Sequence, residues 1–144
     1  MKFDFDNRYY NLNLRSMAVQ IVGESAIGKS LMFQDLQAYI NKHPELKLEG
    51  KFLFVNAQNR VHYTDVLLFR KYQGVIIDNA DIVITPAIDK EIISSQKSSD
   101  TQWIIIGREP RGSIITNSIG TLVHTLDEGN YHFNIDYRQR GQNV

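Results

Sequence analysis

The 144-residue sequence has no cysteine, only three prolines, no excess of charge of either sign and no long apolar run. Without cysteine, the chain has neither a disulfide framework nor a thiolate metal site. Its 16 lysines and arginines balance 16 acidic residues, which argues against coating a polyanion or a membrane surface through bulk charge. No stretch has the length that crosses a bilayer, and the N-terminal residues do not resemble a secretory signal. We therefore expect a cytoplasmic protein that does not contact membranes.

The residues that are present fit one folded domain spanning 1–144. Hydrophobic residues make up 42% of the chain and charged residues 22%, a composition that can bury a core. Short apolar runs alternate with helical patterns, which predicts an α/β protein with a mainly parallel sheet of five strands. The five runs lie at residues 18–22, 52–55, 75–77, 103–106 and 122–126.

Three helices are predicted between these runs. The first follows the first strand and has an apolar stripe along one face. The second begins at Thr64 or Asp65 and ends at Gly74. The third has Thr85 as its N-cap and Pro86 as its first residue, because a hydroxyl and a proline suit those two positions.

The two ends of the chain carry the period-two pattern of half-exposed strands. Turn residues at 127–130 precede alternating apolar and polar residues from Tyr131 to Tyr137, which predicts a C-terminal antiparallel hairpin strand. The alternation of Phe3, Asp4 and Phe5 predicts a further edge strand.

The octet at residues 23–30, GESAIGKS, matches the phosphate-binding pattern G-x-x-x-x-G-K-[ST] at every fixed position. It follows an apolar strand and opens an amphipathic helix, so its backbone N–H groups and the helix dipole would act on one anion. Lys29 would reach the terminal phosphates and the Ser30 hydroxyl would bind Mg²⁺. The predicted nucleotide-binding residues are Gly23, Glu24, Ser25, Ala26, Ile27, Gly28, Lys29, Ser30 and Leu31.

On this octet the chain resembles the P-loop NTPases. The run at 75–77 ends in Asp78, which resembles the Walker B acid of that superfamily. Ligands of parallel sheets sit at the carboxyl ends of the strands, so Asp78 would orient Mg²⁺ together with Ser30. The resemblance implies a three-layer P-loop NTPase fold. Read without the octet, Asp78 would only cap the turn after its strand.

The residues after Asp78 resemble the AAA/STAND-like branch of this superfamily. Many AAA-type proteins have a glutamate at the next position, whereas this chain has Asn79. Asp81 completes an Asp-x-x-Asp pattern and is the predicted group that polarises the attacking water, although a helix cap or turn role fits it equally. Arg108, after the run at 103–106, is predicted to read the γ-phosphate. Arg111 is the alternative arginine.

The catalytic candidates are therefore Lys29, Asp78, Asp81 and Arg108, and ATP with Mg²⁺ is the expected ligand. GTP is disfavoured because the chain lacks the guanine-reading Asn-Lys-x-Asp motif at the expected place. The resemblance implies an ATPase or an ATP-driven switch that acts on a protein partner. A small-molecule or nucleotide kinase, with residues 108–119 as its lid, is an alternative. A nucleotide-binding adaptor without turnover is another.

Two further patterns have alternative readings, and the histidines indicate no site. Basic and aromatic residues at 60–63 and 70–72 would suit nucleic acid, but a solvated surface explains them more simply. Tyr9 and Tyr10 are candidates to stack on a base, although core or edge packing is the simpler reading. The four histidines share no metal-ligand spacing. The chain would also fit a fragment of a longer ATPase, because no lid domain follows residue 144.

Overall fold

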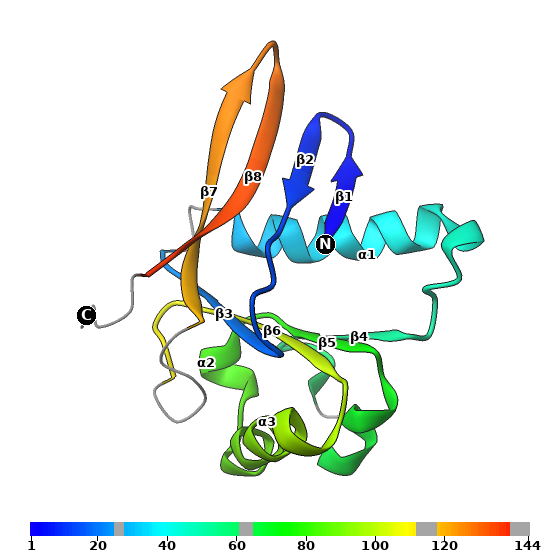
Figure 1. Cartoon of the computed structure of the whole chain (residues 1–144), viewed down its shortest axis with the longest axis vertical. Helices are drawn as coiled ribbons and strands as arrows, with labels where there is room; N and C mark the ends of the chain where they lie inside the picture. The colour runs from blue at the N-terminus through cyan, green and yellow to red at the C-terminus, as the bar shows by residue number, and fades with distance from the viewer. Residues whose placement is uncertain (25–27, 61–64, 112–117, 139–144) are drawn as a thin grey trace.

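A computed structural model of the chain describes residues 1–24, 28–60, 65–111 and 118–138 (Figure 1). The helices are α1 (Lys29–Lys42), α2 (Ala80–Val83) and α3 (Pro86–Ser98), with 3₁₀ helices η2 (Pro44–Leu46) and η4 (Val66–Lys71). The strands are β1 (Lys2–Phe5), β2 (Arg8–Asn11), β3 (Ala18–Val22), β4 (Phe52–Val55), β5 (Gly74–Ile77), β6 (Gln102–Gly107), β7 (Ile119–Asp127) and β8 (Asn130–Tyr137). None of the helices in the described part of the chain is long and apolar enough to cross a membrane.

All eight strands belong to one mixed sheet in the order β1-β2-β8-β7-β3-β6-β5-β4. Strands β3, β4, β5 and β6 run parallel, and β7 pairs parallel with β3. Strand β8 returns antiparallel along β7, β2 adds to β8 in parallel, and β1 closes an antiparallel hairpin with β2.

The expectation of a three-layer fold around a mainly parallel five-stranded sheet is therefore wrong. The two terminal hairpins extend the sheet to eight strands of mixed direction, and few helices cover it. The sheet also curls, since side chains from β1, β2 and β8 and from β3, β5 and β6 pack into one cluster with α1. Twisted strands curl in this way when a helix fills the concave face.

The two faces of the sheet have different cores. On the concave face, α1 packs Met32, Phe33, Leu36 and Ile40 against strands from both ends of the sheet. On the convex face, α2, α3 and η4 cover only β3, β4, β5 and β6. Strands β3, β5 and β6 are buried on both sides, and β4 is buried on one side and partly buried on the other, which explains their continuous apolar sequences.

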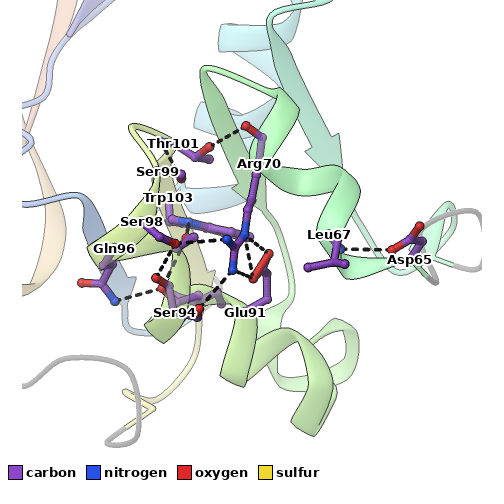
Figure 2. A network of polar contacts seen from close by, with 12 residues as sticks. Asp65, Leu67, Arg70, Glu91, Ser94, Gln96, Ser98, Ser99, Thr101 and Trp103 are labelled. Atoms are coloured by element: carbon purple, nitrogen blue, oxygen red, sulfur yellow. Dashed lines mark hydrogen bonds and ion pairs between the residues drawn. The ribbon is translucent and has the colours of Figure 1, made fainter.

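A polar network ties η4 to α3 on the convex face (Figure 2). The Arg70 guanidinium donates to the buried Glu91 carboxylate with nitrogen to oxygen distances of 2.7 and 2.9 Å. The indole N–H of Trp103 donates to Ser95 Oγ at 2.6 Å. Arg70, one of the basic residues considered for nucleic acid, is thus engaged within the protein.

Most of the locally predicted elements are confirmed. The runs at 18–22 and 52–55 are β3 and β4, and α3 begins with Thr85 as N-cap and Pro86 as its first residue. The predicted C-terminal hairpin and the edge strand at residues 3–5 also form. The second helix differs: it is the 3₁₀ helix η4, capped by Asp65, and Gly74 opens β5 instead of closing the helix.

Candidate functional site

A cavity of about 370 Å³ lies at the carboxyl ends of the parallel strands. Its wall includes Lys29 and Ser30 from the start of α1, Asp78 from the end of β5, Asp81 from α2 and Arg108 from the end of β6. Because parallel strands end at the same edge, residues far apart in sequence meet there. The structure therefore brings together all four predicted catalytic residues.

Lys29 turns back onto the loop that precedes it. Its side chain is buried, and Nζ donates to the carbonyl oxygens of Gly23 and, at 2.9 Å, Glu24. Burial lowers the pKa of the Lys29 ammonium, and Arg108 lowers it further, while Asp78 acts in the opposite direction. A cation held by two carbonyl dipoles at the edge of a cavity can exchange them for a stronger anionic partner.

Ser30 and Asp78 are already in contact. The Ser30 hydroxyl donates to Asp78 Oδ2 at 3.1 Å, although 48 residues separate the two in sequence. Asp78 Oδ1 accepts from the backbone N–H of Asn79, which takes the left-handed conformation with φ 55°. Asparagine tolerates that conformation better than most residues, so the turn holds the carboxylate facing α1.

Asp81 connects α2 to the end of β6. It lies in the first turn of α2, and its Oδ2 accepts from the backbone N–H of Arg108 at 3.0 Å. The Arg108 carbonyl in turn accepts from the N–H of Gly23 at 3.2 Å. Asp81 is therefore neither the N-cap of its helix nor a free turn residue: it joins α2 to the segment at Arg108, whose own carbonyl bonds to Gly23.

The structure separates the two candidate arginines. Arg108 is exposed and lines both the main cavity and a second one of about 410 Å³ beside Gly23. Arg111 donates to the Asp89 carboxylate at 2.9 Å, and its backbone exchanges two hydrogen bonds with the buried side chain of Gln20. Arg111 thus fastens its segment to β3 and α3, and Arg108 is the arginine available to a ligand.

Some of the predicted binding residues lie elsewhere or are not described. Ser25, Ala26 and Ile27 are outside the described residues, as is the middle of the candidate lid at 112–117. Leu31 is exposed on α1 and does not contribute to the described wall of either cavity. Tyr10 is buried, and its ring is stacked between the rings of Phe3 and Phe133. Neither face of the Tyr10 ring is therefore open to a base.

The sequence reasoning missed one side of the cavity. Asn56, Ala57 and Gln58 line it directly after β4. Asn56 holds its own turn, because its Oδ1 accepts from the N–H groups of Gln58 and Asn59 at 3.0 Å. The signal was present in the sequence, since the polar Asn56 and Gln58 follow an apolar run as Asp78 does.

The chain was compared with protein-family models and with curated proteins. No protein-family model matches the chain, and neither does any curated protein.

Proposed function

We propose that the protein binds Mg-ATP at the carboxyl ends of β3, β5 and β6, as an ATPase or ATP-driven switch of the AAA/STAND-like P-loop branch. The observation that carries this proposal is the meeting of Lys29, Ser30, Asp78 and Arg108 around one cavity. Two cations, a hydroxyl and a carboxylate are the groups that a triphosphate and its metal need.

The start of α1 favours an anion. Gly28 takes the left-handed conformation at φ 87°, and among the described residues no side chain caps the helix. The first N–H groups of a helix need partners, and the helix dipole makes this end positive. Phosphate oxygens would satisfy both requirements, with Lys29 adding a full charge.

Ser30 and Asp78 fit a magnesium site. Mg²⁺ binds oxygen and commonly takes one or two protein ligands, completed by substrate phosphates and water. Within the described ranges, no three His, Asp or Glu side chains are grouped closely enough to hold a metal ion. The Ser30 hydroxyl and the Asp78 carboxylate, already 3.1 Å apart at the cavity, supply the two oxygen ligands of this proposal. When bound, the ion would neutralise charge on the phosphates.

Arg108 would contact the γ-phosphate, and Asp81 would accept the proton of an attacking water. Because Asp81 is hydrogen-bonded to Arg108 and Arg108 to Gly23, loss of the γ-phosphate would change the segment after β6. A protein partner would detect that change as a switch. As part of the same proposal, the protein works in the cytoplasm.

Titration with Mg-ATP tests the binding. Lys29→Ala should weaken it by at least about 30-fold, the range expected when one member of a desolvated charge pair is removed. Lys90→Ala, at an exposed lysine of α3, is the matched control and should bind as the parent protein does. Equal binding by the parent protein and Lys29→Ala would refute the proposal.

A nucleotide-binding adaptor without turnover is the second candidate, favoured by Asn79. This exposed amide stands where many AAA-type proteins have a glutamate, and an amide cannot accept a proton from water. Phosphate release separates the two candidates. Release that Asp81→Asn abolishes, with Mg-ATP binding retained, supports an ATPase; binding without release supports the adaptor.

A further inference from the structure

The β7–β8 hairpin projects beyond the strand that leads into the phosphate loop (Figure 1). Strand β7 pairs with β3 only at Gln20–Ile119 and Ile21–Gly120, and it then continues to Asp127 while β3 ends at Val22. The sheet order puts β7 on one side of β3 and β6 on the other. The hairpin therefore flanks the loop on the side opposite Asp78.

One face of this hairpin is shared with α1. Strand alternation puts Leu122 and Phe133 on the concave face, where both belong to the core around α1. Phe133 lies at the beginning of that helix, because a Cβ built on Gly28 would be 3.6 Å from its ring. His124 pairs directly with Phe133, so its side chain is on the same face.

Beyond Phe133 this face is aromatic and open to solvent. The His124 ring centroid lies 5.3 Å from that of Phe133 and 5.7 Å from that of Tyr131, the latter pair in an edge-to-face arrangement. His124 is exposed, Tyr131 is 37% exposed and Leu126, paired with Tyr131, is 61% exposed. We name His124, Leu126 and Tyr131 the hairpin surface.

We propose that the hairpin surface binds the base of the nucleotide whose phosphates occupy the loop, an inference that rests on the function proposed above. Asp78 and Arg108 mark the end of the site where the terminal phosphate lies, towards β5 and β6. A triphosphate held there would run past the start of α1, where Phe133 of β8 lies beside Gly28, so its nucleoside would extend towards β7 and β8.

The chemistry of the hairpin surface suits a nucleobase. Two rings that meet edge to face, with an aliphatic side chain beside them, offer a flat base both a stacking partner and an apolar wall. Stacking accepts any base, because every base has a π-face. The hairpin would therefore select nucleoside triphosphates over inorganic polyphosphate, whichever base they carry.

Two titrations separate base binding from phosphate binding: Mg-ATP and Mg-tripolyphosphate, each with the parent protein, His124→Ala, Tyr131→Ala and Tyr131→Phe. Both alanine variants should bind Mg-ATP about tenfold more weakly or worse, and Mg-tripolyphosphate as before. Tyr131→Phe should restore Mg-ATP binding because it keeps the ring. His132→Ala is the matched control: it removes a histidine from the opposite face, where it stacks on Tyr9.

Each other outcome has a separate meaning. Unchanged Mg-ATP binding in both alanine variants would overturn this inference while leaving the phosphate site intact. Weakening of both ligands alike would also overturn it, because the residues would then act on the loop and not on the base. If Lys29→Ala binds Mg-tripolyphosphate as the parent protein does, the proposed function fails and this inference fails with it.

Discussion

The helices α1 and α3 are of nearly equal length, but they begin in opposite ways. Helix α3 has a Thr85 cap, Pro86 as its first residue and Asp89 in its first turn, all of which stabilise a helix N-terminus. Helix α1 begins at the left-handed Gly28 and has Lys29 where the dipole disfavours a cation. One start is stabilised by its own side chains, whereas the other has no side-chain cap among the described residues and suits the anion proposed above.

Further along, the two helices are built alike. Each helix has one buried carboxylate that forms an ion pair with an arginine of a neighbouring element. The pairs are Asp35 of α1 with Arg8 and Glu91 of α3 with Arg70. The shared feature holds each helix to a neighbouring element, α1 to β2 and α3 to η4. Under the proposed function, the difference at the N-termini separates a ligand-binding helix start from a structural one, and the following predictions test this.

The largest effect is expected at Asp35. Its carboxylate accepts from Arg8 Nε at 2.7 Å and from the Tyr10 hydroxyl at 2.6 Å. Burial and the bond to Asp35 raise the pKa of Tyr10, so that hydroxyl remains a donor. Asp35→Ala leaves both donors without this partner and should lower the free energy of unfolding by about 3–5 kcal/mol. Urea unfolding followed by the fluorescence of the buried Trp103 measures it.

Glu91→Ala should lower the free energy of unfolding by less, about 2 kcal/mol, which is in the range found for hydrogen bonds to charged groups. The Arg70 side chain is 32% exposed and can turn to water, and no buried hydroxyl loses its acceptor. The same urea experiment compares the two variants. A loss at Glu91 equal to that at Asp35 would contradict the view that Tyr10 makes the α1 anchor the stronger one.

Thr85→Ala removes the cap of α3 and should lower the free energy of unfolding by about 1 kcal/mol. The Thr85 hydroxyl oxygen accepts from the N–H of Ile88 at 3.2 Å, and Thr85→Ser keeps that acceptor. Mg-ATP binding should be unchanged, because this helix start is outside the site. Weaker Mg-ATP binding by the alanine variant would contradict the view that the start of α3 is purely structural and that only the start of α1 binds the ligand.

The elements of the parallel part could be predicted because each depends on local sequence. The run Trp103–Ile104–Ile105–Ile106 is apolar because β6 is covered on both faces, and Thr85 with Pro86 starts a helix wherever the helix packs. The meeting of Ser30 and Asp78 could also be predicted, because the ends of parallel strands share one edge.

The eight-stranded sheet could not be predicted in the same way. Strand β2 pairs with β8 through contacts such as Tyr10 with Phe133, more than 100 residues apart in sequence. Alternation identifies a half-buried strand but does not identify its neighbour. The roles of Gln20 and Asp89, which hold Arg111 and so leave Arg108 for the site, likewise depend on packing that no local pattern encodes.

The smallest effect is expected at Lys29, and its sign is opposite. Lys29→Met should raise the free energy of unfolding at pH 7, by less than the change at Thr85, while Mg-ATP binding is lost. Burial lowers the pKa of Lys29 below its ordinary value of 10.5, so at pH 7 its charge is less favourable in the folded than in the unfolded state. Methionine keeps the length of the side chain and removes the charge.

The pH dependence distinguishes this cause from a packing effect. Between the folded and the ordinary pKa, the unfolded chain binds more protons than the folded protein, so the parent protein gains stability as the pH rises through that interval. Lys29→Met lacks this gain. The amount by which its free energy of unfolding exceeds that of the parent protein should therefore shrink as the pH rises towards 10.5. An advantage that stays constant with pH would point to packing. A loss of stability at pH 7 would mean that the start of α1 is stabilised by its lysine, as that of α3 is by Thr85, and is not held ready for an anion.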